Sequence, residues 1–254
     1  MDDRAGYPHY LEFRGVWKSF ERPVLLDCSF QLEAGQTLGI IGRSGVGKSV
    51  ALSHLMGFLK PDQGRVIVAH EDITDYPERE LNRIRKKVTM VFQSGALFDS
   101  LTVAENVAFP MENRGERGGR GLAGAVEELL AAVEIEAYRD VFPSELSTGM
   151  KRAVAIARAL AARPEAILYD EPTTMVDTPM SEHIGELISR LKQQLRLTSV
   201  VVTHDLTLLR KVADTVIFLY DGRVIFFGSL GELEEAGHPH IQEFLALDRF
   251  QPVS

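Results

Sequence analysis

A glycine-rich segment, Gly42–Ser49, constrains this chain more than any other part of the sequence. It reads G-x-x-x-x-G-K-S, the pattern of a phosphate-binding loop. An apolar run at 38–41 precedes it and predicts a buried strand. Apolar residues follow it at the i, i+3, i+4, i+7 spacing of one helix face, namely Leu52, Leu55, Met56 and Leu59. The segment therefore has the strand–loop–helix context that the motif requires.

The physical chemistry of this segment favours phosphate. Glycines let the backbone curl, so that successive N–H groups point into one hollow. The start of the following helix adds unpaired N–H groups and the positive end of its dipole. The Lys48 ammonium group suits the outer phosphates, and the Ser49 hydroxyl suits Mg²⁺. The sequence therefore predicts a chain that binds ATP with Mg²⁺.

Length and composition agree with a globular nucleotide-binding protein. The chain has 254 residues, enough for one large α/β domain, and a formal net charge of −8, which argues against nucleic acid as the main partner. No apolar run reaches the 18 residues of a membrane-spanning helix. The acidic start, Met1–Arg4, does not resemble a signal peptide, and the single cysteine, Cys28, cannot form an internal disulfide. We therefore expect a cytosolic protein.

The order of patterns along the chain predicts one domain, 1–254, with an insertion. Residues 10–37 have the pattern of a β meander that leads into the phosphate-loop strand. Residues 94–160 have mainly helical patterns and interrupt a strand-rich chain. We therefore expect a catalytic core at 10–93 and 161–254 with a helical subdomain at 94–160. Within the core, Thr178-Pro179 is expected to cap a long helix.

Several buried strands are predicted to end at a polar residue. These residues are Gln93, the pair Asp170 and Glu171, and His204. In a parallel α/β sheet, ligands bind beyond the carboxyl ends of the strands. That rule places all four side chains at the same edge as Lys48 and Ser49.

Each strand-end residue has a chemical role open to it. Asp170 suits a direct or water-mediated contact with Mg²⁺. Glu171, the next residue, suits the general base that polarises the attacking water. Gln93 and His204 suit contacts with phosphate, water or metal, although a single histidine or glutamine at a strand end is more often purely structural. Phe20 could stack on adenine, but a half-buried strand aromatic is the plainer interpretation.

From residue 11 to 248 the chain resembles the nucleotide-binding subunit of an ABC transporter. The family's motifs occur in order, as the Walker A loop Gly42–Ser49, Walker B at 167–170 and the signature motif Leu146–Met150. The resemblance implies an α/β fold with a RecA-like phosphate-loop NTPase core, an N-terminal antiparallel β subdomain and an inserted helical subdomain.

The resemblance also implies roles for particular residues. It assigns catalysis to Glu171 as base, His204 as switch histidine and Gln93 as Q-loop glutamine. It assigns Mg²⁺ to Ser49, Gln93 and Asp170. The implied nucleotide-binding residues are Phe20, Gly42, Ser44, Gly45, Gly47, Lys48, Ser49, Val50, Ser147, Gly149 and the D-loop aspartate Asp177.

The signature motif departs from the usual L-S-G-G-Q. Ser147 and Gly149 match the family pattern, but Thr148 replaces the first glycine and Met150 replaces the glutamine. The functional core of the motif is a serine cap and glycine backbone at a helix N-terminus, aimed at a γ-phosphate. Thr148 is β-branched, and β-branched residues do not favour positive φ. The departure bears on the strength of the phosphate contact more than on its existence.

A narrower resemblance is to the Mla/Mce-type ATPases, which energise lipid movement between membranes. It rests on Gly47–Val50, on the run Val91–Val107 and on a signature that ends in Met150. It implies a phospholipid cargo and an Mce-type lipid-binding partner. The family's mechanism implies a homodimer, in which each ATP lies between one Walker A loop and the other copy's signature helix. It also implies a separate integral-membrane permease, and a peripheral location on the cytoplasmic face of the inner membrane.

Three other functions stay open at this point. The first is the ATPase of a polar-solute importer that works with a binding protein. The second is a non-transport ABC ATPase that acts on DNA or ribosomes, although this chain has one cassette and no long coiled coil before Ser147. The third is a nucleotide-controlled switch that scarcely hydrolyses ATP. The presence of Asp170, Glu171 and His204 together argues against this function.

Overall fold

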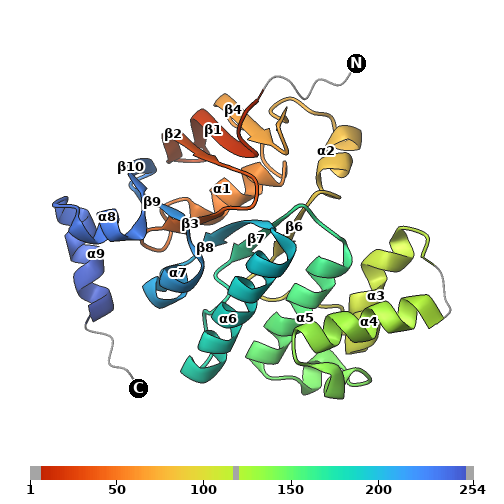
Figure 1. Cartoon of the computed structure of the whole chain (residues 1–254). Helices are drawn as coiled ribbons and strands as arrows, with labels where there is room; N and C mark the ends of the chain where they lie inside the picture. The colour runs from red at the N-terminus through yellow and green to blue at the C-terminus, as the bar shows by residue number, and fades with distance from the viewer. Residues whose placement is uncertain (1–6, 117–119, 250–254) are drawn as a thin grey trace.

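The computed structural model describes residues 7–116 and 120–249 and contains two sheets surrounded by helices (Figure 1). The strands are β1 (Leu11–Ser19), β2 (Pro23–Leu32), β3 (Thr37–Ile41), β4 (Gln63–Val68), β5 (Glu71–Asp72), β6 (Val88–Val91), β7 (Ala166–Asp170), β8 (Thr198–Val202), β9 (Thr215–Tyr220) and β10 (Arg223–Gly228). The α-helices are α1 (Lys48–Leu55), α2 (Glu78–Ile84), α3 (Val103–Asn113), α4 (Arg120–Ala132), α5 (Thr148–Ala161), α6 (Thr178–Leu195), α7 (Leu206–Val212), α8 (Leu230–Glu235) and α9 (Pro239–Arg249). Short 3₁₀ turns lie at Glu136–Tyr138 and Pro143–Glu145.

The larger sheet has six strands in the order β10-β9-β3-β8-β7-β6. Its five strands from β9 to β6 run parallel, and β10 is antiparallel to β9. Side chains alternate between its two faces, as the period of two in a strand requires. In β7, for example, Leu168 packs into the core on one face, and Ile167 and Tyr169 pack into the core on the other. A central parallel sheet buried on both faces is the predicted core, so the predicted fold class is confirmed here.

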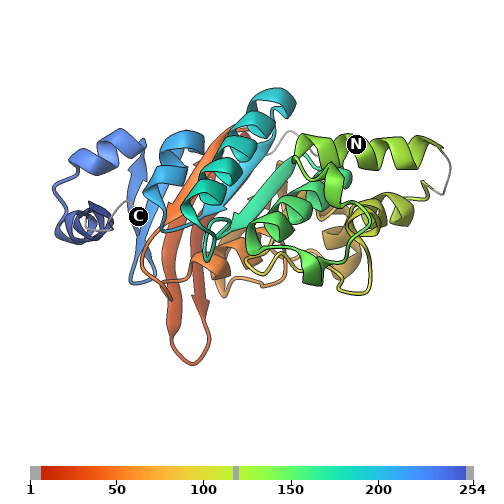
Figure 2. The same cartoon turned by 90° about the horizontal axis from the view of Figure 1, so that it is seen from below.

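The smaller sheet is antiparallel and has the order β2-β1-β4-β5. In Figure 2 the β1–β2 hairpin extends away from the six-stranded sheet. The expected meander over residues 10–37 is therefore wrong in one respect. β3 belongs to the other sheet, and β1 takes β4 as its second neighbour. β3 has buried residues at all five positions, so it suits the middle of a covered sheet better than a half-exposed antiparallel one.

Helices α3, α4 and α5 gather at one side of the molecule, and α8 and α9 lie at the other (Figure 1). Among the described residues of 94–160, the regular structure is helical, in line with the predicted helical subdomain. α5 also packs on β6 and α6, so it joins this group of helices to the core. The limits at 94 and 160 stay a proposal.

Two helix boundaries differ from the sequence expectation. α1 ends at Leu55, so Leu59 lies beyond the helix whose face it was expected to extend. α6 is capped by Asp177, whose Oδ1 accepts a hydrogen bond from the Met180 N–H at 2.9 Å, and not by the Thr178-Pro179 pair. An aspartate carboxylate is a stronger helix cap than a threonine hydroxyl, and Pro179 then occupies the first turn, where no N–H is needed.

The start of the chain, Met1–Arg4, on which the expectation of no signal peptide rests, lies outside the described residues. Within 7–116 and 120–249, none of the helices has both the length and the apolar character that crossing a membrane requires.

Candidate nucleotide site

The loop between β3 and α1 is shaped by glycines in conformations that other residues avoid. Gly45 has φ of 81° with no atom within 4 Å of a Cβ built on it, so its exposed side is open to a ligand. Gly47 has φ of 107° and is the N-cap of α1, and no side chain caps that helix. A Cβ on Gly47 would lie 2.9 Å from Leu25 Cδ2. The first N–H groups of α1 are therefore free to bind an anion.

Lys48 is buried at the start of α1, and its ammonium group is held by backbone. Its Nζ donates to the Gly42 carbonyl at 2.8 Å and to the Arg43 carbonyl at 3.1 Å. Burial lowers the pKa of Lys48, against the attraction of Glu171 and Asp170. The two carboxylates keep a positive charge close to where the outer phosphates would lie.

Glu171 follows β7 and carries the most interactions of the candidate catalytic residues. One carboxylate oxygen lies 3.7 Å from Lys48 Nζ. The other lies 2.9 Å from His204 Nδ1 and accepts from the Thr174 hydroxyl at 3.0 Å. Its φ of 48° is left-handed, which is uncommon for a residue with a side chain. The carboxylate lies between Lys48 of the phosphate loop and His204.

The pKa shifts of the Glu171–His204 pair follow from this geometry. Burial alone raises the pKa of Glu171, but the hydrogen bond from His204 and the charges of His204 and Lys48 bring it below the usual value. The hydrogen bond to Glu171 raises the pKa of His204, and burial opposes it. Glu171 is therefore ionised at neutral pH and able to accept a proton.

Asp170 and Ser49 form the second polar pair of the site. Ser49 Oγ donates to Asp170 Oδ1 at 3.2 Å. Burial raises the pKa of Asp170, and the hydrogen bond from Ser49 opposes that shift. A hydroxyl beside a carboxylate is the donor set that a hard divalent cation prefers. This pair therefore fits Mg²⁺.

Lys48, Ser49, Glu171 and His204 line one open cavity of about 450 Å³, a size ordinary for small-molecule sites. Most of the residues predicted from sequence line it. They are Phe20, Ser44, Gly45, Gly47, Lys48, Ser49, Val50, Gln93, Glu171 and His204. Phe20 is 57% exposed at the rim, with the Lys18 ammonium 5.7 Å from its ring centre. Gly42 lies beneath the cavity, where it accepts from Lys48.

Besides Gly42, four predicted residues do not line this cavity. Asp170 accepts a hydrogen bond from Ser49, which does line it, and the other three lie elsewhere. Ser147 is the N-cap of α5, Gly149 lies in the first turn of α5, and Asp177 is the N-cap of α6. Ser147 Oγ accepts from the Met150 N–H at 3.3 Å, so the expected serine cap is present. Thr148 is the first helical residue of α5, and its φ is not among the positive values. These three residues form a separate group at two helix N-termini.

Sequence reasoning missed three contributors to the site. Val24 and Thr174 line the cavity, and the Thr174 hydroxyl donates to Glu171. Arg152 is 4% exposed on α5, and its Nη1 donates to the Phe92 carbonyl at 2.9 Å, directly before Gln93. No pattern in the sequence marks these residues, because each role depends on a contact between segments far apart in the chain or on a loop conformation.

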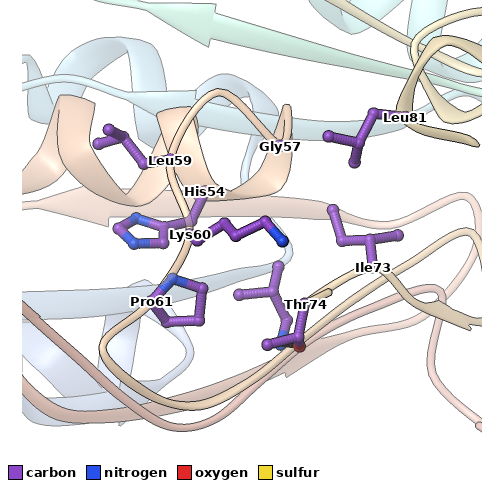
Figure 3. A pocket seen from close by; sticks show the side chains of 9 residues that line it. His54, Gly57, Leu59, Lys60, Pro61, Ile73, Thr74 and Leu81 are labelled. Carbon is purple, nitrogen blue, oxygen red and sulfur yellow. Dashed lines mark hydrogen bonds between the residues drawn. The ribbon is translucent and has the colours of Figure 1, made fainter. Parts of the chain in front are cut away.

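A second, smaller cavity lies between α1, β4 and α2 (Figure 3). His54 lies against it, 1% exposed, with Nδ1 2.7 Å from the Val50 carbonyl. Burial lowers the pKa of His54. The lining contains no carboxylate and has room for about one water molecule. It is therefore not a second nucleotide site.

Comparison with known proteins identifies the family. The family model described as ABC transporter matches residues 25–174. The chain is 35% identical over 244 residues to the methionine import ATP-binding protein MetN 2 of Pseudomonas entomophila, covering 94% of this chain and 73% of that protein. The chain belongs to the ABC transporter family. Its ATPase domain spans the phosphate loop, Walker B and the intervening helices.

Other relatives agree with this assignment. The methionine import ATP-binding protein MetN of Geobacillus kaustophilus is 40% identical over 206 residues, which cover 80% of this chain and 59% of that one. An ATP-binding cassette solved as a dimer, in a post-hydrolysis state with ADP and Pi, superimposes with a TM-score of 0.79 at 34% identity, covering 87% of this chain and 98% of that one. cbiO1 of Clostridium perfringens, part of the ABC transporter complex cbiONQ, gives a TM-score of 0.82 at 27% identity, covering 95% of this chain and 97% of that one. The fold is that of an ABC ATPase.

Proposed function

We propose that this chain is the ATP-hydrolysing subunit of an ABC transporter and powers a separate membrane permease. The observation that carries the proposal is the single cavity at the carboxyl edge of the parallel sheet. Lys48, Gln93, Glu171 and His204 come from four different segments and line the same space. A cation, a carboxylate and a histidine around a phosphate loop are the groups that phosphoryl transfer to water needs.

Nucleotide binding is assigned to the loop and its rim. The free N–H groups of α1, the Ser44 and Gly45 backbone and the Lys48 ammonium bind the phosphates, and Phe20 offers a face for the adenine. Ser49 and Asp170 would hold Mg²⁺, with Gln93 as a further oxygen donor, and the ion would neutralise charge on the phosphates.

Hydrolysis is assigned to Glu171. Its carboxylate accepts a proton from the water that attacks the γ-phosphate, while His204 and Thr174 hold the carboxylate in place. Lys48 Nζ lies 3.7 Å from a Glu171 carboxylate oxygen, so the lysine that binds the outer phosphates lies close to the base. The network around Glu171 supports a working ATPase over a switch that scarcely hydrolyses.

Two copies are proposed to pair, because Ser147, Gly149 and Asp177 do not reach the cavity of their own chain. Their helix N-termini present a serine hydroxyl and free N–H groups, which suit a phosphate in the second copy. A relative solved as a dimer supports this arrangement. The chain would work at the cytoplasmic face of the inner membrane, bound to its permease, and its net charge of −8 gives no support to a nucleic-acid partner.

The cargo class best supported is a small polar solute taken up with a solute-binding protein. The relatives reported above carry the name methionine import ATP-binding protein. The lipid reading of the Mla/Mce type, with an Mce-type partner, is the second candidate. It rests on the run Val91–Val107 and on Met150, which are features of the sequence alone.

A phosphate-release assay tests the enzymatic part. The purified chain should release phosphate from ATP with Mg²⁺ present, and chelation by EDTA should abolish release. No release above background, from folded protein that binds ATP, would contradict the proposal.

A pull-down tests the partner and cargo class. Tagged Glu171→Gln protein would be recovered with ATP from gently solubilised native membranes, and copurifying proteins identified by mass spectrometry. A permease with a solute-binding protein supports the importer. A permease with an Mce-type lipid-binding protein supports the lipid reading instead. Ribosomal or DNA-bound partners without a permease would overturn the transport function.

A further inference from the structure

The N-termini of α5 and α6 lie next to each other, and both begin with a residue assigned above to the second copy's nucleotide. The two helices pack together, as the views in Figures 1 and 2 agree. Ser147 caps α5 through the Met150 N–H, and Asp177 caps α6 through the Met180 N–H. The relative position of these two caps therefore depends on how α5 and α6 fit together at their first turns.

The contact between the first turns of α5 and α6 is made by the Met180 side chain, which lies against Gly149. A Cβ built on Gly149 would lie 2.0 Å from Met180 Cγ, 3.0 Å from its Sδ and 3.3 Å from its Cβ. These are the three nearest heavy atoms, so Met180 is the closest neighbour of Gly149 outside its own helix backbone. Gly149 is buried, and its φ is not in the left-handed region. Backbone conformation therefore does not require glycine here, whereas the close approach of Met180 does.

We propose that Met180 is a positioning residue, which fixes the signature helix against the D-loop helix through its contact with Gly149. The proposal rests on the pairing of two copies proposed above. Ser147 and Asp177 then reach the second copy at a fixed spacing. Gly149 is glycine in this chain because of an intrachain contact, and not only because a phosphate of the second copy approaches its backbone.

This role predicts which measured quantities change. Met180 does not line the nucleotide cavity, so removing its side chain should leave the affinity of the isolated chain for nucleotide unchanged. The turnover number should fall, because turnover needs both caps aligned on the second copy. A displacement of about 1 Å at a reacting centre can cost about a hundredfold in rate.

A double-mutant cycle tests the proposal. Gly149→Ala, Met180→Ala and the double variant would be compared for kcat, KM, binding of a fluorescent ATP analogue and thermal midpoint. We expect Gly149→Ala to lower kcat at least about tenfold. Adding Met180→Ala to it should restore kcat to that of Met180→Ala alone, within about threefold, because the two changes act on one contact. Met180→Leu should keep most of the wild-type kcat.

Two controls separate this effect from general ones. Gly124→Ala makes the same substitution inside α4, where no atom lies within 4 Å of the new Cβ, so it should leave kcat unchanged. Leu195→Ala shortens a 54% exposed apolar side chain at the far end of α6 and should also leave kcat unchanged.

The outcomes are distinct. A double variant whose kcat lies more than about threefold below that of Met180→Ala would overturn the proposal, because glycine would then be needed for a reason other than Met180. If Gly149→Ala does not fold, Met180→Ala decides by itself, since a kcat equal to that of Leu195→Ala would also overturn it. Absence of Mg²⁺-dependent hydrolysis in the wild-type chain is a different result, and would refute the proposed function first.

Discussion

The nucleotide cavity and the paired helix N-termini of α5 and α6 are built in opposite ways. The cavity lies within one chain, because the loops that follow strands of the parallel sheet converge at one edge and the β1–β2 hairpin adds Phe20 and Val24. The helix N-termini carry Ser147, Gly149 and Asp177, and these residues contact no phosphate loop of their own chain. Binding should therefore depend on the first region alone, and turnover on both.

The largest effect is expected inside the cavity. Glu171→Gln should lower kcat by about 10²- to 10⁴-fold, the usual contribution of a general base. It should keep ATP binding, because the amide retains the shape of the side chain and Lys48 is unchanged. Phosphate release and analogue binding measure the two quantities. The matched control is Glu165→Gln, which makes the same substitution directly before β7, at the end of the strand opposite Glu171. Its kcat should stay within about twofold of wild type. Near-normal turnover by Glu171→Gln would show that Glu171 is not the general base.

The next effect is on binding. Lys48→Ala removes a charged donor to the phosphates, worth about 1.5–3 kcal/mol, and should weaken ATP binding about ten- to a hundredfold. Lys60→Ala removes a lysine with a 60% exposed side chain and should not change the affinity. Titration with a fluorescent ATP analogue measures both variants. Equal affinities for Lys48→Ala and wild type would contradict the role given to the loop.

The contrast between the two regions also explains what the sequence could predict. The apolar runs before Gln93, Asp170 and His204 have no competing interpretation, and parallel strands bring their ends together whatever the loops do. The gathering of these residues was predicted from that pattern, and the fold class was predicted from the resemblance to the ABC family. The methionine-import relatives, by contrast, favour a cargo class that the run Val91–Val107 did not suggest.

Contacts between distant segments could not be predicted in the same way. The contact of Met180 with Gly149 depends on the packing of α5 on α6, and the Arg152 contact with the Phe92 carbonyl depends on the same packing. The backbone conformation of two loop residues could not be predicted either. Glu171 and Met175 adopt φ of 48° and 61°, a region in which glycine is the favoured residue. Such strain at a functional loop is imposed by its surroundings and is not encoded in local sequence.

A smaller effect is expected at the helix N-termini. Ser147→Ala should cost about 0.5–2 kcal/mol of helix stability, and a thermal midpoint a few degrees lower. It should also lower kcat without changing the binding of nucleotide to the isolated chain. Ser229→Ala is a matched control, because Ser229 caps α8 with the same 3.3 Å contact to the third residue. Both variants should lose stability, but only Ser147→Ala should lose turnover. Equal turnover in the two would argue against a phosphate role for the signature serine.

The smallest expected effect is the pH dependence of the stability contributed by the His204–Glu171 pair. The folded-state pKa of His204 is raised, so its stabilising contribution is full below the unfolded value of about 6.5 and is lost as pH rises through the folded pKa. The pKa of Glu171 is lowered, so its contribution is present above about 4.5 and is lost as pH falls through the folded pKa. Both contributions coincide between about pH 4.5 and 6.5. The free energy of unfolding of wild type should exceed that of His204→Gln most in this window, by less than about 1 kcal/mol, because His204 is half exposed. Chemical denaturation at pH 6 and pH 8.5 measures the difference, and a gap that widens with rising pH would contradict the pairing of His204 with Glu171.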